Sequence, residues 1–282
     1  MVNYFLSPQG ICIEDDNLDF DLEKTFNCGQ CFRFEKISQD CFRGTVFSKN
    51  IKLYKNKKRI YIFGISEDDF KKDFINYFDF NTDYSLMRKR ISKIHPILKS
   101  AAEYSKGIRI LNQNPWEVLC SFIISQNNNI PRIKLIIKRL CQNFGEKISQ
   151  GVYNFPDAEC LSNLKKSDLE VLKCGFRYKY ILDAAKKISD KEIVLNDLKE
   201  KNLHESRRIL MKILGVGPKV AECTLLFGFH KLNAFPIDTW IKKTMDSFWE
   251  NVDADFFGEY AGLAQQYMFY YVRMNPEVLN FN

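Results

Sequence analysis

Residues 210–243 read LMKILGVGPKVAECTLLFGFHKLNAFPIDTWIKK, a pattern that predicts two short helices joined by a tight turn. The first helix is predicted from apolar residues at helical spacing, which are Ile209, Leu210, Ile213 and Leu214. Gly215 lies where a C-terminal cap needs a residue that tolerates positive φ. Pro218 has its φ preset for a first helical position, so we expect the second helix to begin there and to carry Lys219 in its first turn.

The turn between these helices is a candidate phosphate site. The backbone N–H groups of Val216, Gly217 and Lys219 cannot all find partners within a helix, and the helix dipole adds partial positive charge beside them. The same field disfavours an ammonium group, so a partly desolvated Lys219 is expected to act as a neutral, nucleophilic amine. The alternative is an ordinary turn between packed helices, with a solvated lysine.

A carboxylate follows in the segment Phe235-Pro236-Ile237-Asp238-Thr239, where Asp238 is expected to be a helix N-cap after a proline-stiffened loop. The two glycines, Lys219 and this segment together resemble the helix-hairpin-helix and Gly/Pro-Asp motif of base-excision DNA glycosylases. The resemblance implies that Lys219 attacks the sugar C1′, that Asp238 assists it, and that Gly215 and Gly217 lie against the DNA backbone.

Composition is consistent with a nucleic-acid partner without requiring one. The chain has 282 residues, enough for two or three small domains, and a formal net charge of +7. Nine cysteines at irregular spacing, with no secretory leader, indicate a reducing cytosol, and Cys28 and Cys31 are interpreted as structural thiols. No apolar run approaches the roughly 20 residues of a membrane span, so we expect a soluble protein.

Alternating segments between about residues 4 and 64 predict an antiparallel sheet, with a hairpin turn at 55–58. Within it, Asn27-Cys28-Gly29-Gln30-Cys31-Phe32-Arg33-Phe34 resembles the G-Q-x-F-R-W-like segment of eukaryotic-type 8-oxoguanine DNA glycosylases. The resemblance implies that Gly29 offers its carbonyl to the N7–H that distinguishes 8-oxoguanine from guanine. Taken alone, such a glycine more often marks a bulge or bend.

Beyond residue 67 the periodicity becomes helical, with helices expected at 69–78, 86–94, 97–104, 116–125, 130–144, 238–249 and 255–274, and short helices within 155–189. The run Asn127-Asn128-Asn129 is either a polar helix stop or a set of amides that enter a gap in a duplex. With Ile130 and Arg132 it resembles the family's N-N-N-I-x-R sequence. The resemblance implies that Asn127 fills the space left by a flipped base and that Arg132 reads the opposite cytosine.

Two further segments resemble the same family. Cys174-Gly175-Phe176-Arg177-Tyr178-Lys179-Tyr180 resembles its G-Y-R-x-R-Y segment, which implies that Phe176 wedges into the stack and that Arg177 makes a second contact to the opposite base or backbone. The alternative is a core aromatic beside a helix cap.

In Ala264-Gln265-Gln266-Tyr267-Met268-Phe269, Gln265 and Phe269 share a helix face, as in the family's A-Q-x-x-x-F. The resemblance implies that Gln265 bonds the edge of the damaged base, that Phe269 stacks on it and that Cys223 meets its other face. An aromatic stripe at this spacing is otherwise normally core packing.

The whole pattern resembles an 8-oxoguanine DNA glycosylase with associated lyase activity, acting through base flipping, a lysine Schiff base and β-elimination. We expect an α+β protein: an N-terminal antiparallel sheet domain with flanking helices (1–105), then two mainly α-helical domains (106–282) with a helix-hairpin-helix at about 204–229. Two alternatives are a monofunctional glycosylase for alkylated bases, against which Lys219 argues, and a non-catalytic DNA-binding protein, against which Asp238 and the Gln265/Phe269 pair argue. The expected partner is double-stranded DNA containing 8-oxoguanine, bound by a monomer in a prokaryotic cytoplasm at the nucleoid.

Trp240 departs from the family pattern, because eukaryotic members carry a histidine two residues after the aspartate, and this change is expected to alter phosphate contact. No cofactor is expected to be required. The absence of a C-terminal four-cysteine run excludes an iron–sulfur cluster of the endonuclease III kind. The resemblance implies a monovalent cation held by the main-chain oxygens of Met211, Ile213 and Val216.

Overall fold

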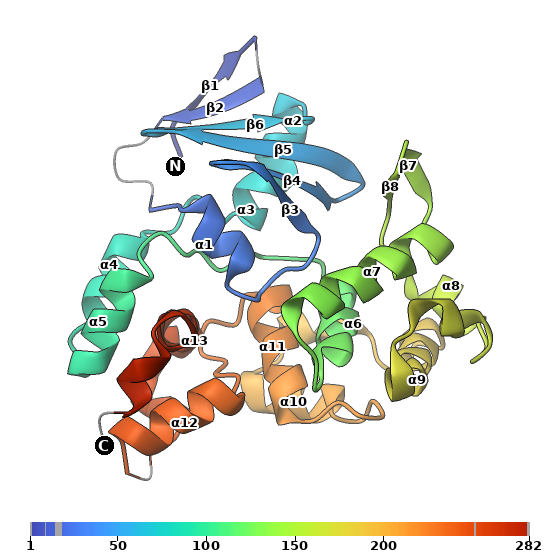
Figure 1. Ribbon diagram of the computed structural model, residues 1–282. Coiled ribbons are helices and arrows are strands. Elements are labelled where there is room, and N and C mark those ends of the chain that lie inside the picture. The colour runs from blue at the N-terminus through green and yellow to red at the C-terminus, as the bar shows by residue number, and fades with distance from the viewer. Residues whose placement is uncertain (1, 9, 15–18, 251, 281–282) are drawn as a thin grey trace.

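The computed structural model describes residues 2–8, 10–14, 19–250 and 252–280 (Figure 1). The strands are β1 (Tyr4–Ser7), β2 (Gly10–Glu14), β3 (Phe34–Ser38), β4 (Cys41–Val46), β5 (Lys49–Asn56), β6 (Arg59–Phe63), β7 (Lys147–Ser149) and β8 (Val152–Tyr153). The α-helices are α1 (Leu22–Asn27), α2 (Glu67–Asp69), α3 (Ile75–Tyr77), α4 (Tyr84–Ile91), α5 (Pro96–Tyr104), α6 (Pro115–Ser125), α7 (Ile130–Phe144), α8 (Ala158–Ser162), α9 (Tyr178–Ser189), α10 (Leu203–Leu210), α11 (Pro218–Phe229), α12 (Thr239–Phe248) and α13 (Ala261–Met274). One segment, η1 (Phe70–Phe74), is a π-helix. The 3-10 helices are η2 (Asp168–Leu172), η3 (Gly175–Arg177), η4 (Leu195–Lys199), η5 (Ala254–Tyr260) and η6 (Pro276–Asn280).

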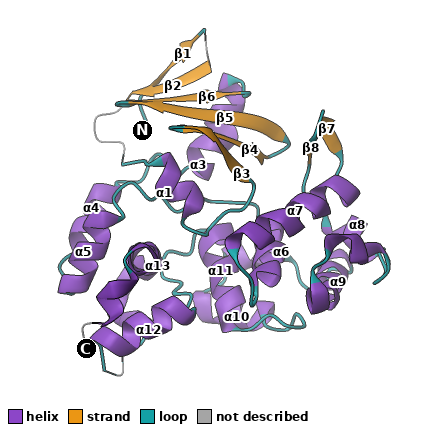
Figure 2. Ribbon diagram, viewed as in Figure 1, coloured by secondary structure: helices purple, strands orange, loops and turns teal. Residues whose placement is uncertain are grey.

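The N-terminal sheet is antiparallel throughout and lies to one side of the helical body (Figure 2). Its strand order is β1-β2-β6-β5-β4-β3. Alternate residues such as Ile51 and Leu53 are buried, which is the burial expected when one face of a sheet covers a core. Phe70 and Phe74 from η1 fill that core. The predicted α+β class with an N-terminal antiparallel sheet is therefore confirmed.

The helical body is organised around α6 and α11, which pack against each other. Every residue from 118 to 124 and from 220 to 228 is buried, as expected for helices that are apolar on all sides. A Cβ on Gly228 would come within 2.9 Å of the Pro115 Cα, so the two backbones approach closely only because this residue is glycine. Across the described residues, no helix is long and apolar enough to cross a bilayer.

The helix-hairpin-helix is present, but its first helix ends earlier than predicted. α10 stops at Leu210, and the following amides bond three residues back, from Lys212 to Ile209 and from Ile213 to Leu210. The amide of Leu214, which a longer helix would direct to Leu210, instead donates to the Asp183 carboxylate of α9 at 2.7 Å. Ile213 remains buried in the turn, which is why the apolar periodicity continued past the helix end.

Three other expectations need correction. The last predicted helix, 255–274, is interrupted at Gly258, whose φ of +69° separates η5 from α13. The β-rich segment also contains the short helix α1, capped by the Asp21 side chain at the amide of Lys24. The helix expected at 86–94 runs instead from Tyr84 to Ile91.

Two helices begin where the sequence predicted, with a proline in the first turn of each. α11 begins at Pro218, and α7 has its predicted bounds with Pro131 in its first turn.

The extended segment between α5 and α6 joins the two cores, because Ile108 and Ile110 pack in the helical core and Leu111 packs under the sheet.

Candidate active site

Lys219 is held at the start of α11, where the hairpin turn delivers it to the end of α6. Its Nζ lies 3.5 Å from the Ser125 Oγ and 4.8 Å from the centroid of the Phe122 ring. The side chain is half-buried. Its expected place in a first helical turn is confirmed, whereas its expected neutral form stays a prediction.

Asp238 is the N-cap of α12, as predicted, and its Oδ1 accepts a hydrogen bond from the Ile241 amide at 2.8 Å. Burial is the largest influence on this carboxyl and raises its pKa, while backbone amides and the positive charge of Lys219 act in the opposite direction. Burial also raises the pKa of the Cys223 thiol to about 11, and this group feels both Lys219 and Asp238. These three side chains therefore belong to one electrostatic site.

Glu222 supports this site and was missed in the sequence. It is 5% exposed, and its carboxylate accepts from the Phe235 amide at 2.9 Å and from Arg207 at 3.1 Å. One side chain of α11 thereby connects α10 to the loop that leads to Asp238. The available signal was an acidic residue inside the apolar run of residues 220–229.

The predicted base pocket brings Gly29 against Phe269. Gly29 has a φ of +86°, and a Cβ there would lie 3.4 Å from the Phe269 Cε1 and 3.7 Å from the Ile130 Cδ1. On the same helix as Phe269, Gln265 is 5% exposed, and among the described residues its Oε1 has no hydrogen-bond partner. A buried amide oxygen without a partner requires an explanation, and a ligand is one.

Asn127 lies in the exposed turn between α6 and α7 with a φ of +47°. Arg177 reaches this turn from η3: its Nε donates to the Gln126 carbonyl at 2.9 Å and its Nη2 to the Asn127 carbonyl at 2.9 Å, while its Nη1 donates to the Cys174 carbonyl at 3.0 Å. The guanidinium predicted to contact DNA thus holds the asparagine turn in this structure.

Phe176 is 46% exposed, so it is not a core residue and the core-packing alternative is wrong. Its ring centroid lies 4.7 Å from the Arg177 guanidinium carbon. Arg132 is exposed in the first turn of α7, and among the described residues it has no ion-pair partner. An exposed aromatic ring and an exposed guanidinium thus lie near the same turn.

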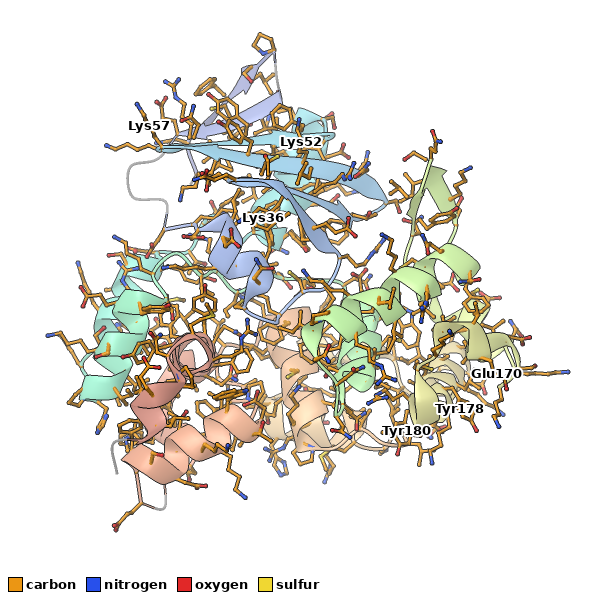
Figure 3. The ribbon with its side chains drawn as sticks, in the orientation of Figure 1. Lys36, Lys52, Lys57, Glu170, Tyr178 and Tyr180 are labelled. Carbon is orange, nitrogen blue, oxygen red and sulfur yellow. The ribbon has the colours of Figure 1, made fainter. Side chains whose placement is uncertain are left out.

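The hairpin glycines differ in their surroundings. Gly215 has a φ of +75°, and a Cβ there would come within 2.5 Å of the Tyr180 ring, which projects from α9 (Figure 3). Nothing lies within 4 Å of the corresponding position at Gly217, so the backbone there is open to a partner. Trp240 lies half-buried in the first turn of α12.

The main-chain oxygens predicted to hold a cation lie in the same turn. The Ile213 carbonyl accepts from the Val216 amide at 3.0 Å, while no described residue donates to the carbonyls of Met211 or Val216. In the described chain, no group of three or more His, Cys, Asp or Glu side chains is placed to hold a metal. Cys28 and Cys31 are buried free thiols.

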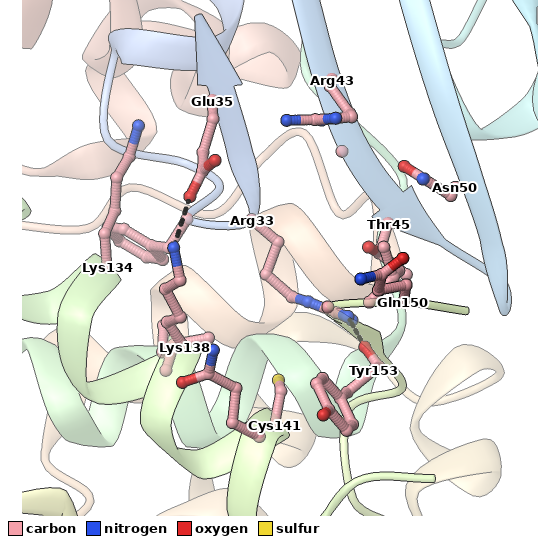
Figure 4. Close-up of a pocket in the computed structure, with 16 residues that line it drawn as sticks. Arg33, Glu35, Arg43, Thr45, Asn50, Lys134, Lys138, Cys141, Gln150 and Tyr153 are labelled. Carbon is pink, nitrogen blue, oxygen red and sulfur yellow. Dashed lines mark hydrogen bonds and ion pairs between the residues drawn. The ribbon is translucent and has the colours of Figure 1, made fainter. Parts of the chain in front are cut away.

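A separate cavity of about 320 Å³ lies between β4, α7 and the β7–β8 hairpin (Figure 4). Its basic side chains include Arg33, which pairs with Glu117 at 3.0 Å, and Lys138, which pairs with Glu35 at 3.5 Å. None of the predicted site residues lines it.

Comparison with known proteins accounts for most of the chain. Residues 13–119 match the model of the 8-oxoguanine DNA glycosylase N-terminal domain, and residues 120–254 match the HhH-GPD superfamily base excision DNA repair proteins. An N-glycosylase/DNA lyase of Saccharomyces cerevisiae is 37% identical over 194 residues, which cover 63% of this chain and 51% of that enzyme. The chain thus spans about half the length of the yeast relative.

Solved structures match over nearly the full length. The Clostridium acetobutylicum 8-oxoguanine glycosylase/lyase, solved with double-stranded DNA that contains cytosine opposite 8-oxoguanine, is 37% identical with a TM-score of 0.91, covering 98% of both chains. MBOgg1, solved with a low-affinity DNA ligand, is 37% identical with a TM-score of 0.93, covering 98% of this chain and 99% of that one.

Proposed function

Because this chain belongs to the 8-oxoguanine DNA glycosylases of the HhH-GPD superfamily, a family of base-excision repair enzymes, we propose that it removes 8-oxoguanine from duplex DNA with Lys219 as nucleophile. The observation that carries this assignment is the electrostatic site shared by Lys219, Asp238 and Cys223. Neither alternative considered from the sequence is favoured, since an alkylated-base glycosylase or a simple DNA binder has no need of this lysine.

The proposed reaction begins when the unprotonated Lys219 Nζ attacks C1′ of the extruded nucleotide. The C1′–N9 bond breaks, its electron pair leaves with the base, and the ionised Asp238 stabilises the positive charge that develops on the sugar. Of the two N–H protons of the amine, one neutralises the departed base and the other passes to O4′ as the sugar ring opens to a Schiff base. Loss of a C2′ proton then expels the 3′ phosphate, which nicks the strand.

Base recognition is assigned to the pocket beside this centre. We assign the unpartnered Gln265 oxygen to the Watson–Crick edge of the base, the Phe269 ring to one base face and Cys223 to the other. The Gly29 carbonyl would accept the N7–H that guanine lacks. A polar group left unpaired in the free protein gains most from a ligand that satisfies it.

The space left in the duplex is assigned to the turn between α6 and α7. Asn127 would occupy the gap, Arg132 would donate to the acceptors of the opposite cytosine, and Phe176 would wedge the stack. Gly217 and Trp240 would lie against the DNA backbone. Such backbone contacts set position and contribute no base preference.

The reaction as proposed needs no cofactor. A monovalent cation at the hairpin is a further part of the proposal, supported by the unpartnered carbonyls of Met211 and Val216. It would neutralise part of the charge of a bound DNA phosphate. If DNA affinity is unchanged when potassium is replaced by a large organic cation at fixed ionic strength, the proposal of a bound cation is wrong. Since the proposed substrate is genomic DNA, we place the enzyme, as a monomer, at the nucleoid of a prokaryotic cytoplasm.

Borohydride trapping tests the nucleophile, because only a Schiff base is reduced to a stable protein–DNA bond. The wild-type protein should form a covalent complex with an 8-oxoguanine·cytosine duplex, and Lys219→Gln should form none while still binding that duplex. The matched control is Lys212→Gln, an exposed lysine of the same turn, which should still be trapped at saturating protein. Trapping of Lys219→Gln at the wild-type rate would refute the assignment.

A further inference from the structure

Gln266, the residue next to Gln265 on α13, faces the segment that carries Gly29. It is 2% exposed, and its Nε2 donates to the Cys28 carbonyl at 2.8 Å. Two turns further along the helix, the Nη2 of Arg273 donates to the Asn27 carbonyl at 3.0 Å. Residues 266, 269 and 273 are spaced to lie on one helix face, so the helix that carries the stacking ring of Phe269 also holds the peptides before Gly29.

The chain after Gly29 is held in the same manner from the other side. The Gln113 Nε2 donates to the Gln30 carbonyl at 2.9 Å. The Gln30 side chain in turn donates to the Arg109 carbonyl at 2.7 Å and accepts from the Leu111 amide at 2.9 Å. The Cys28 and Gln30 carbonyls, one residue before and one residue after Gly29, thus each accept a hydrogen bond from a buried side-chain amide.

The carbonyl of Gly29 itself is different. Among the described residues, none donates to it. At a φ of +86°, glycine has no Cβ to restrict it, and a free glycine would sample many orientations of this oxygen. An acceptor without a partner, between two peptides that are each bonded, is an arrangement suited to one incoming N–H donor.

We propose that Gln266 is a positioning residue that aims the Gly29 carbonyl at the N7 side of the extruded base, and that it thereby sets the preference for 8-oxoguanine over guanine. The inference rests on the proposed function of the pocket. Guanine presents an N7 lone pair to a fixed carbonyl oxygen and is repelled, whereas 8-oxoguanine presents N7–H and is bound. A carbonyl free to turn away would lose both effects.

The test variant is Gln266→Met, which keeps the length of the side chain and removes the amide. Arg273 is a poorer choice because its guanidinium carbon lies 5.3 Å from the Phe269 ring centroid, so its removal would disturb stacking as well. Single-turnover excision of 8-oxoguanine should fall about tenfold, the effect of roughly one misplaced hydrogen bond. Strand cleavage at an abasic site, which offers no base to the Gly29 carbonyl, should stay within about twofold of wild type on the same reasoning.

A second readout addresses preference directly. In a Lys219→Gln background, which leaves the base uncleaved, Gln266→Met should lower the ratio of affinities for 8-oxoguanine and guanine duplexes. The matched control is Ser105→Ala, which removes a buried hydrogen bond of 3.0 Å to the Tyr267 carbonyl of the same helix without touching the Gly29 segment. That variant should change neither the two rates nor the affinity ratio.

The outcomes are separable. Unchanged 8-oxoguanine excision in Gln266→Met, or an equal loss of excision and abasic-site cleavage, would overturn the positioning role. A wild-type protein that does not excise 8-oxoguanine at all would instead overturn the proposed function. If Gln266→Met does not fold, Gln113→Met releases the peptide on the other side of Gly29 and should produce the same selective loss, whose absence would count equally against the inference.

Discussion

Replacing Asp238 with asparagine should make the protein more stable and far less active. Burial raises the pKa of the Asp238 carboxyl above its ordinary value. A carboxyl with a raised folded-state pKa adds stability that is complete below its unfolded pKa and is lost as the pH rises through the folded value. At neutral pH the ionised Asp238 therefore opposes folding.

Asparagine removes this charge but keeps an oxygen that can accept from the Ile241 amide, a bond of 2.8 Å in this structure. As N-caps the two residues are nearly equivalent. We therefore expect Asp238→Asn to melt at a higher temperature than the wild type near pH 7, with the difference vanishing as the pH falls below the ordinary carboxyl range. Thermal denaturation at several pH values measures this.

Excision should move in the opposite direction. Loss of one preorganised electrostatic stabiliser costs on the order of 3–4 kcal/mol, or about a hundred- to a thousandfold in the chemical step. Single-turnover excision from an 8-oxoguanine·cytosine duplex, at protein concentrations that saturate binding, isolates that step. In the wild type, the acidic limb of the rate profile should lie above the ordinary carboxyl pKa, because the ionised form is required.

Two results would refute this reasoning. An Asp238→Asn protein that excises within about threefold of wild type would show that this charge does not stabilise the developing sugar cation. A variant that melts lower than wild type at pH 7, with the gap closing at acid pH, would show that the carboxylate stabilises the fold.

Further predictions concern the pocket and the asparagine turn. Phe269→Ala should weaken excision by about 1–3 kcal/mol, the stacking contribution of one base, and leave the affinity for undamaged duplex nearly intact; an unchanged single-turnover rate would remove the ring from the pocket. Arg132→Ala should flatten excision rates across the four opposing bases, from a wild-type preference for cytosine of about 1–3 kcal/mol; equal rates in the wild type would show that this arginine points elsewhere. Arg177→Met should lower the free energy of unfolding of the DNA-free protein by about 1.5–3 kcal/mol, because it removes charge-assisted hydrogen bonds to the carbonyls of Gln126, Asn127 and Cys174. A DNA contact alone would leave stability in denaturant unchanged.

The sequence predicted those features that depend on a few neighbouring residues. The start of α11 at Pro218 and the N-cap at Asp238 are of this kind, since a fixed φ and a short carboxylate act within one turn. The early end of α10, in contrast, depends on a contact with a distant part of the chain. It depends on Asp183, a residue of α9 that is remote in sequence and takes the Leu214 amide. No local pattern contains that partner.

The candidate site divides in the same way. Gln265 and Phe269 were identifiable from a motif. The role proposed for the neighbouring Gln266 depends on its hydrogen bond to the Cys28 carbonyl, which lies near the opposite end of the chain. Arg177 shows the limit most clearly. Its residue type suited a nucleic-acid contact, whereas its burial and its bonds to the Gln126 and Asn127 carbonyls are apparent only in three dimensions.

The bonds of Arg177 also have a mechanical consequence. They join the turn that carries Asn127 to η3, which carries Phe176, so the two segments that would enter DNA share one attachment. Insertion of the phenylalanine between base pairs would be transmitted to the asparagine through the guanidinium, and withdrawal of either would pull on the other. Bending of the duplex and filling of the vacated space would then be a single movement.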